Sequence, residues 1–169
     1  MSTKITPSYI ATNLIRSPYI FNVGHSLTGQ TITTGTITTV DFDTIHFDPN
    51  SNFNTSTNIY TVPVSGYWYL HSQLLWAGTS VFDAGERTDL RVYINGVQYA
   101  NYGFDIQIPD ENSAYTNLYT MKTNGIALLN GGDEITIRIW QNTGVNQYTY
   151  SGGSANKYTC FSGALLTAI

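Results

Sequence analysis

The sequence predicts one all-β domain folded as an antiparallel sandwich. Short runs of alternating apolar and polar residues recur along the chain and are separated by Gly, Asn and Pro, which is the pattern of half-buried strands. No window of a dozen residues keeps apolar side chains at helical spacing. The chain has 169 residues and is 41% hydrophobic, so one sizeable core can form without disulfide support.

The clearest local signal is the Asn95-Gly96 pair between two β-rich segments. A two-residue hairpin turn needs positive φ at both positions, and Asn-Gly tolerates this better than other pairs. The pair therefore predicts an antiparallel hairpin. The expected strands are Tyr19–Val23, Thr36–Phe42, Thr44–Phe47, Ile59–Val62, Tyr67–Trp76, Thr88–Ile94, Val97–Phe104, Ala114–Lys122, Ile126–Leu129, Glu134–Gln141 and Tyr158–Thr167.

Period-two alternation also predicts which side chains form the core. One face of the strand at 67–76 and one face of the strand at 134–141 are apolar, and two such faces meet inside a sandwich. On the second strand, Thr136 and Arg138 fall on the opposite face, which we expect to contact water. The predicted core residues are Trp68, Leu70, Leu74, Trp76, Ile135, Ile137, Ile139 and Phe161.

The chain divides into an arm at residues 1–17 and the β domain at 18–169. The first segment contains Pro7, is followed directly by Pro18, and is too short for a stable isolated helix. We interpret it as an attachment arm whose apolar contacts come from Ile5, Tyr9, Ile10, Leu14 and Ile15.

Charge and composition exclude several classes of function. The chain carries seven Lys and Arg against eleven Asp and Glu, a formal charge of −4, with no basic cluster, so nucleic-acid binding is not expected. We see neither a secretory leader nor an apolar run long enough to span a membrane. We therefore expect synthesis in a host cytoplasm and no membrane partner. Cys160 has no second cysteine to pair with and is expected to be a small buried residue.

From Tyr19 onward, the chain contains in order the motifs YIFNV, VDFDTIHFDPNSNFN, TVPVSGYWYL, RVYINGVQ, LNGGD and FSGALL. This order of motifs resembles the complement component 1q and tumour necrosis factor superfamily. The resemblance implies a jelly roll of about ten strands that associates as a homotrimer around a threefold axis. It implies no catalytic residue and no cofactor.

The final strand supports self-association independently. Period two sends Phe161 and Leu165 to one face, and the opposite face is also apolar or small, which is unusual for a strand that faces water. The resemblance places this strand beside the threefold axis. The expected trimer interface contains Tyr93, Tyr158, Cys160, Ser162, Ala164 and Leu166.

Chemical alternatives rest on the acidic residues and the histidines. Asp41, Asp43, His46 and Asp48 could suggest a carboxylate hydrolase or a zinc site, but on one unbroken strand they fall on both faces. The Asp- and Asn-rich segment 41–52 could supply oxygen ligands to calcium, although it lacks the EF-hand spacing. The chain has no Gly-x-Ser-x-Gly motif. We expect no enzyme and no metal, and leave calcium open.

Function is then expected from the fold, the arm and the composition. A Thr- and Asn-rich jelly roll with a short arm, and without a collagen-like Gly-X-Y segment, resembles a virion component such as a bacteriophage capsid decoration protein or head-fibre tip. We expect a trimer that decorates, cements or tips a capsid. The alternative is an extracellular module that binds carbohydrate or a cell-surface receptor through exposed Tyr, Trp and Asn.

Overall fold

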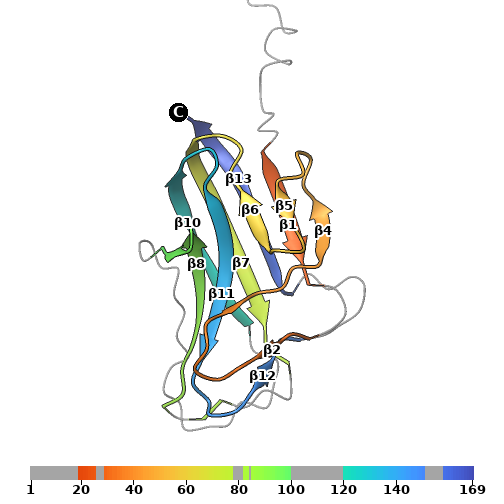
Figure 1. Ribbon diagram of the computed structural model, residues 1–169, viewed down its shortest axis with the longest axis vertical. Helices are drawn as coiled ribbons and strands as arrows, with labels where there is room; N and C mark the ends of the chain where they lie inside the picture. Colours follow the sequence, from red (N-terminus) through yellow and green to blue (C-terminus); the bar gives the residue numbers. More distant parts are fainter. Residues whose placement is uncertain (1–18, 26–28, 78–81, 84, 100–119, 151–157) are drawn as a thin grey trace, which may run out of the picture.

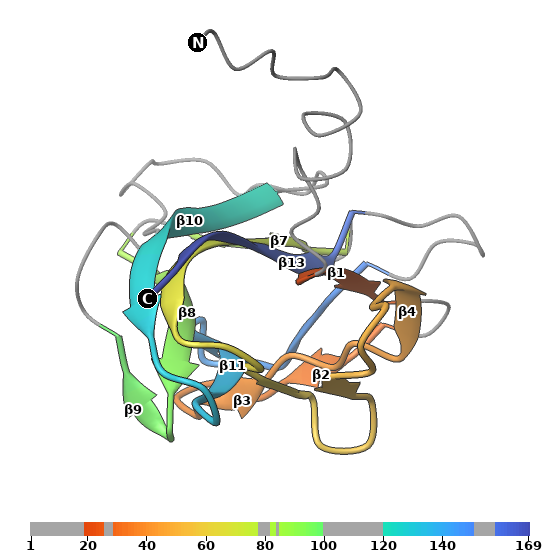
Figure 2. The same ribbon diagram turned by 90° about the horizontal axis from the view of Figure 1, so that it is seen from above.

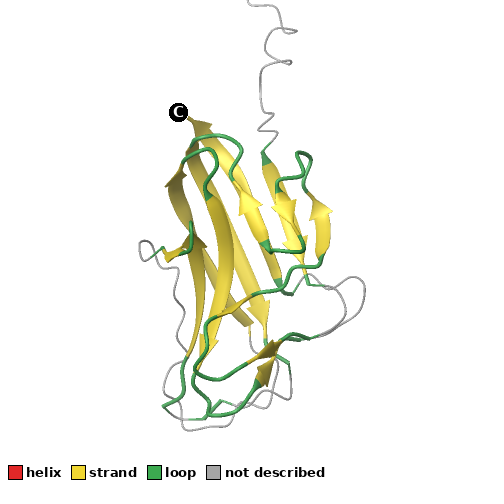
Figure 3. Cartoon of the chain, in the orientation of Figure 1, coloured by secondary structure: helices red, strands yellow, loops and turns green. Residues whose placement is uncertain are grey.

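The computed structural model describes residues 19–25, 29–77, 82–83, 85–99, 120–150 and 158–169. Every regular element in these ranges is a strand, and Figure 3 shows the arrangement of strands and loops. Within the same ranges, no helix is long and apolar enough to cross a membrane. The strands form two layers, with the core between them (Figure 2).

One layer is a five-stranded antiparallel sheet in the order β10-β7-β13-β1-β4. Strands that are adjacent in this sheet are far apart in sequence, because the chain crosses between the two layers as in a jelly roll. Figure 1 shows these strands running along the long axis of the molecule. The strands are β10 (Thr120–Leu129), β7 (Gly66–Leu75), β13 (Cys160–Ala168), β1 (Ile20–Gly24) and β4 (Thr44–Phe47).

The other layer is a six-stranded sheet in which β11 takes the central place. Its main path is β5-β6-β11-β8-β9, and β3 also pairs with β11. A separate two-stranded sheet joins β12 to β2. The strands are β5 (Phe53–Asn54), β6 (Ile59–Thr61), β11 (Glu134–Gln141), β8 (Thr88–Ile94), β9 (Val97–Gln98), β3 (Thr38–Thr39), β12 (Gln147–Tyr148) and β2 (Thr31–Ile32).

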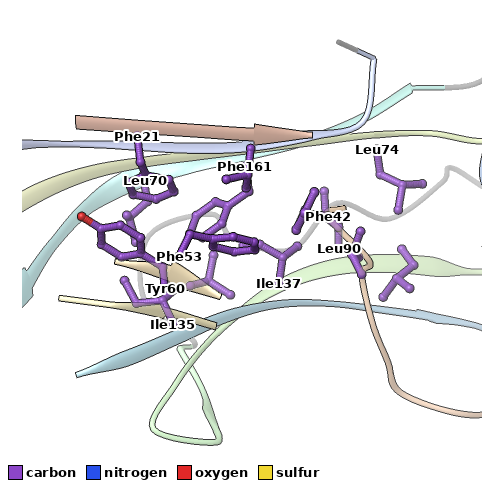
Figure 4. Packing of buried hydrophobic residues seen from close by; sticks show 14 of the residues in the cluster. Phe21, Phe42, Phe53, Tyr60, Leu70, Leu74, Leu90, Ile135, Ile137 and Phe161 are labelled. Carbon is purple, nitrogen blue, oxygen red and sulfur yellow. The ribbon is translucent and has the colours of Figure 1, made fainter. Parts of the chain in front are cut away.

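The core forms where the apolar faces of the two layers meet. Phe21, Leu70 and Phe161 point from the five-stranded sheet toward Tyr60 and Ile135 of the other sheet (Figure 4). All eight predicted core residues are buried, so the predicted period-two register is confirmed. Burial of this apolar surface is the main favourable contribution to folding.

The predicted strand bounds agree best where alternation is strong. Thr44–Phe47, Thr88–Ile94 and Glu134–Gln141 match the structure at both ends. The expected strand Thr36–Phe42 is reduced to Thr38–Thr39. The prediction missed three two-residue strands, β2, β5 and β12.

The region around Asn124-Gly125 requires a correction. We expected two strands separated by this turn-like pair, but β10 is continuous from Thr120 to Leu129. Every one of its ten residues is paired with β7, and this pairing outweighs the local turn preference of Asn-Gly. The expected strand Ala114–Lys122 lies outside the described residues up to residue 119. Residues 1–17 also lie outside them, so the division between arm and domain stays a prediction.

Candidate self-association surface

The five-stranded sheet has one face on the core and one face directed outward. On β7, Trp68, Leu70 and Leu74 are fully buried, whereas the alternating Tyr67 and Tyr69 are exposed. The register aligns outward residues of neighbouring strands in rows across the sheet. The rows differ in polarity, so the outward face has an apolar end and a polar band.

The apolar end lies near the C-terminus of the chain, where β13 finishes (Figure 1). One row is Ile126 opposite Tyr69, Tyr69 opposite Ala164, and Ala164 opposite Ile20. The next begins with Leu128 opposite Tyr67. The six large side chains of the apolar end are each between 40 and 54% exposed: Ile20, Tyr67, Tyr69, Ile126, Leu128 and Leu166.

A groove of about 480 Å³ continues the apolar end around the edge of the sheet. Tyr67, Ile126 and Leu128 contribute to its wall from β7 and β10. Tyr99 contributes from the segment after β9, and its backbone N–H donates to the carbonyl of Val92. The groove is therefore part of the same apolar surface, at the edge strand β10.

The polar band crosses the middle of the same face. Its central row is Asn124, His71, Ser162 and Asn22 on four adjacent strands. The row beyond it contains Lys122, Gln73 and Cys160. Gln73 Nε2 donates a hydrogen bond of 2.8 Å to the carbonyl of Tyr158, which anchors the chain just before β13.

The charges on this sheet have one sign. None of the five strands contains Asp or Glu, and their ionisable cationic side chains are Lys122, His71 and His46. Partial burial lowers the pKa of His71 below its ordinary value of 6.5, and the charge of Lys122 lowers the pKa further. Burial raises the pKa of the Cys160 thiol, so Cys160 is a neutral, buried side chain, as the sequence predicted.

The structure brings most of the predicted interface residues together. Ser162 and Ala164 lie on the outward face of β13, Cys160 lies at the start of the same strand, and Leu166 is exposed where the register with β7 shifts. Tyr158 is exposed directly before β13. Ser162, Ala164 and Leu166 therefore follow one another along the outward side of β13, from the polar band to the apolar end.

Tyr93 does not belong to this group, and its expected position beside the final strand requires correction. It lies on β8 of the other sheet, opposite Thr136 of β11. Its ring is nearly buried beneath Arg138, whose guanidinium carbon is 4.2 Å from the ring centroid, a cation–π contact. Thr136 is also buried, so the outward face of β11 is less exposed to water than expected.

The sequence analysis missed the residues that make the surface apolar. Tyr67, Tyr69, Ile126 and Leu128 were assigned to strands but not to the interface. A signal was present, because the non-core positions of the segment GYWYL are tyrosines where a water-facing strand usually has polar residues. The predicted arm residues Ile5, Tyr9, Ile10, Leu14 and Ile15 lie outside the described residues.

The acidic residues of segment 41–52 accept local hydrogen bonds. Asp41 Oδ1 accepts from Asn58 Nδ2 at 2.6 Å, and Asp48 Oδ2 accepts from the backbone N–H of Phe53 at 2.7 Å. Among the residues that the structure describes, no three His, Cys, Asp or Glu side chains converge as metal ligands do. His25 is buried, with Nδ1 2.9 Å from the carbonyl of Asp41. These contacts hold loops in place.

Comparison with known proteins defines the fold. No family model and no curated protein matches the sequence. The globular domain of zebrafish complement 1qA protein matches the structure with a TM-score of 0.58 at 17% identity, covering 89% of this chain and 99% of that chain. Eiger TNF from S. frugiperda matches with a TM-score of 0.58 at 10% identity, covering 89% of this chain and 94% of that chain. Murine APRIL matches with a TM-score of 0.56 at 14% identity, covering 87% of this chain and 98% of that chain. The chain thus has the complement 1q and tumour necrosis factor-like jelly-roll fold that the resemblance implied.

Proposed function

We propose that the protein is a non-enzymatic structural module that forms a homotrimer through the outward face of its five-stranded sheet. The observation that carries the proposal is the apolar end, where Ile20, Tyr69 and Ile126 are exposed in three strands of one sheet. An antiparallel sheet with one face in water normally places polar side chains there. A second copy of the chain can cover this surface.

A closed trimer with threefold symmetry can bury the apolar end of every protomer. Each protomer would present the same outward face, and a closed cyclic assembly leaves no apolar end uncovered. Burial of apolar surface contributes roughly 25 cal/mol per Å². We expect each pair of protomers to bury more than roughly 1,000 Å², the lower range for a stable biological contact.

The trimer is proposed to decorate, cement or tip a larger assembly, and the assembly we propose is a bacteriophage capsid. The support is the neutral polar composition together with the segment at residues 1–17, whose apolar side chains Ile5, Tyr9, Ile10, Leu14 and Ile15 can engage a partner. The protein would accordingly be located in the virion.

Truncation tests the attachment separately from the trimer. A chain that starts at Ser17 retains β1, which begins at Ile20, and should remain a folded trimer, with three times the mass of the truncated chain. It should no longer co-sediment with assembled capsids that bind the full-length chain. If the truncated chain unfolds, the segment is an integral part of the domain and the attachment proposal is wrong.

One observation favours a second candidate function, carbohydrate or receptor binding outside the cell. Tyr148 and Tyr158 are exposed, and the rings of Tyr150 and Tyr158 meet edge to face at 6.1 Å. Exposed tyrosines can pack on sugar rings and form hydrogen bonds with hydroxyl groups. A glycan array separates the two candidates: binding that is lost in Tyr148→Ala and Tyr158→Ala but retained in Tyr67→Ala would favour this second function.

A further inference from the structure

We propose that His71 makes assembly through the outward face sensitive to acid, so that a trimer formed at neutral pH dissociates as the pH falls. This inference rests on the proposed function, because it concerns the same surface. The argument depends on the position of His71, the charges around it and the absence of a compensating carboxylate on the sheet.

His71 occupies the centre of the polar band. It lies on β7, which is flanked by β10 on one side and β13 on the other. Asn124 of β10 and Ser162 of β13 are directly opposite. Within the described part of the chain, no hydrogen bond to its imidazole ring is formed. A copy that covers this face therefore removes water from a ring that depends on solvent when it is protonated.

The neighbours of His71 on the five strands carry no carboxylate. Lys122 of β10 and Cys160 of β13 lie in the next row, with Gln73 and Tyr69 at the two neighbouring outward positions of β7 itself. The charge of Lys122 lowers the pKa of His71, and burial raises the pKa of the Cys160 thiol, which keeps the thiol neutral. Since none of the five strands contains Asp or Glu, the charged group that these strands place beside a protonated His71 is Lys122, another cation.

The direction of the pH effect follows from this environment. Partial burial and Lys122 already lower the pKa of His71 from 6.5 in the single chain, and removal of water in the trimer lowers the pKa further. Above pH 6.5 the ring is neutral in both states and does not oppose assembly. As the pH falls through the lowered pKa of His71 in the free protomer, that protomer binds a proton that the trimer excludes, so trimer stability decreases with further acidification.

The expected effect is steep because three rings titrate together. If each protomer of the trimer excludes one proton, the association constant falls up to about 1,000-fold per pH unit below the lowered pKa of His71 in the free protomer, tenfold for each proton. Sedimentation equilibrium of the full-length chain at pH 8 and pH 5 measures this change. Circular dichroism at both pH values shows whether the protomer remains folded.

Variants identify the responsible group. His71→Gln keeps a neutral polar side chain and should remain trimeric at pH 5, whereas His71→Lys should be dissociated at both pH values. His46→Gln, on edge strand β4 of the same sheet, is the matched control and should dissociate in acid like the wild type. A folded wild type that is trimeric at pH 5, or a His71→Gln variant that dissociates there, overturns the inference and leaves the trimer intact. A wild type that is monomeric at pH 8 overturns both proposals.

Discussion

The ring of Phe21 stacks on the ring of Tyr60 across the sandwich, with centroids 3.8 Å apart and planes inclined by 19°. Phe21 belongs to β1 of the five-stranded sheet and Tyr60 to β6 of the other sheet. Phe21 also meets Phe161 of β13 edge to face at 4.8 Å. The contact with Tyr60 joins the two layers, and the contact with Phe161 packs neighbouring strands of one sheet, so the shape of the outward face depends on this part of the core.

Leu70 provides a test of the core. Its two cross-strand neighbours are Gly125 of β10 and Gly163 of β13, so neither neighbour has a side chain that could fill the space that truncation would leave. Leu70→Ala should lower the free energy of unfolding by about 2–5 kcal/mol, toward the upper part of this range. Urea denaturation at fixed protein concentration measures the change.

The control for Leu70→Ala is Val97→Ala. Val97 is 70% exposed at the hairpin after Gly96, so its truncation should change the free energy of unfolding by less than about 0.5 kcal/mol. If Leu70→Ala is equally mild, the strand register is wrong by one residue, because such a shift exchanges the two faces.

Gly163 tests the packing of β13 against β1. A Cβ atom at this position would lie 2.6 Å from Cε1 of Phe21, and the Phe21 ring cannot move easily because it stacks on Tyr60. Gly163→Ala should therefore destabilise the protein by about 1–3 kcal/mol. Thermal denaturation should show a lower Tm for this variant.

Gly131→Ala is the matched glycine control. At this position a Cβ atom would have its nearest contact at 3.6 Å, an ordinary van der Waals distance. The Tm should be nearly unchanged. An equal loss in both variants would show that the effect comes from glycine replacement in general and not from the contact with Phe21.

Local patterns predicted the fold where local and tertiary preferences agree. Asn95 and Gly96 have φ values of 51° and 78°, as the two-residue turn requires, and Ile94 pairs with Val97. The alternation in 134–141 gave a strand with both ends correct. In these segments the turn residues and the alternating apolar residues are close together in sequence, so the local sequence is enough to predict the strands and the turn.

Long-range pairing was not predictable in the same way. The β12–β2 pair joins Gln147 to Ile32, and strands this short carry no periodic signal. The predicted position of Tyr93 beside the final strand was wrong for a related reason. Alternation assigns a side chain to one of the two faces of its strand, but it does not say which sheet contains the strand. The apolar end likewise depends on the order β10-β7-β13-β1, which only the tertiary structure defines.

Ala164→Arg tests the proposed interface at its centre. Ala164 lies opposite Tyr69 and Ile20 on the outward face. In a threefold assembly, the substitution would bring three like charges together where water is excluded, which is energetically costly. We expect loss of the trimer with a folded protomer, measured by sedimentation velocity together with circular dichroism. A variant that still sediments as a trimer would place the interface elsewhere.

The mass of the wild-type protein in solution tests the central proposal most directly. The chain has a mass of 18.7 kDa, and the proposed assembly contains three copies. Light scattering on the full-length protein at micromolar concentration and pH 8 should give three times that mass. A mass of one chain under these conditions would contradict the proposed trimer.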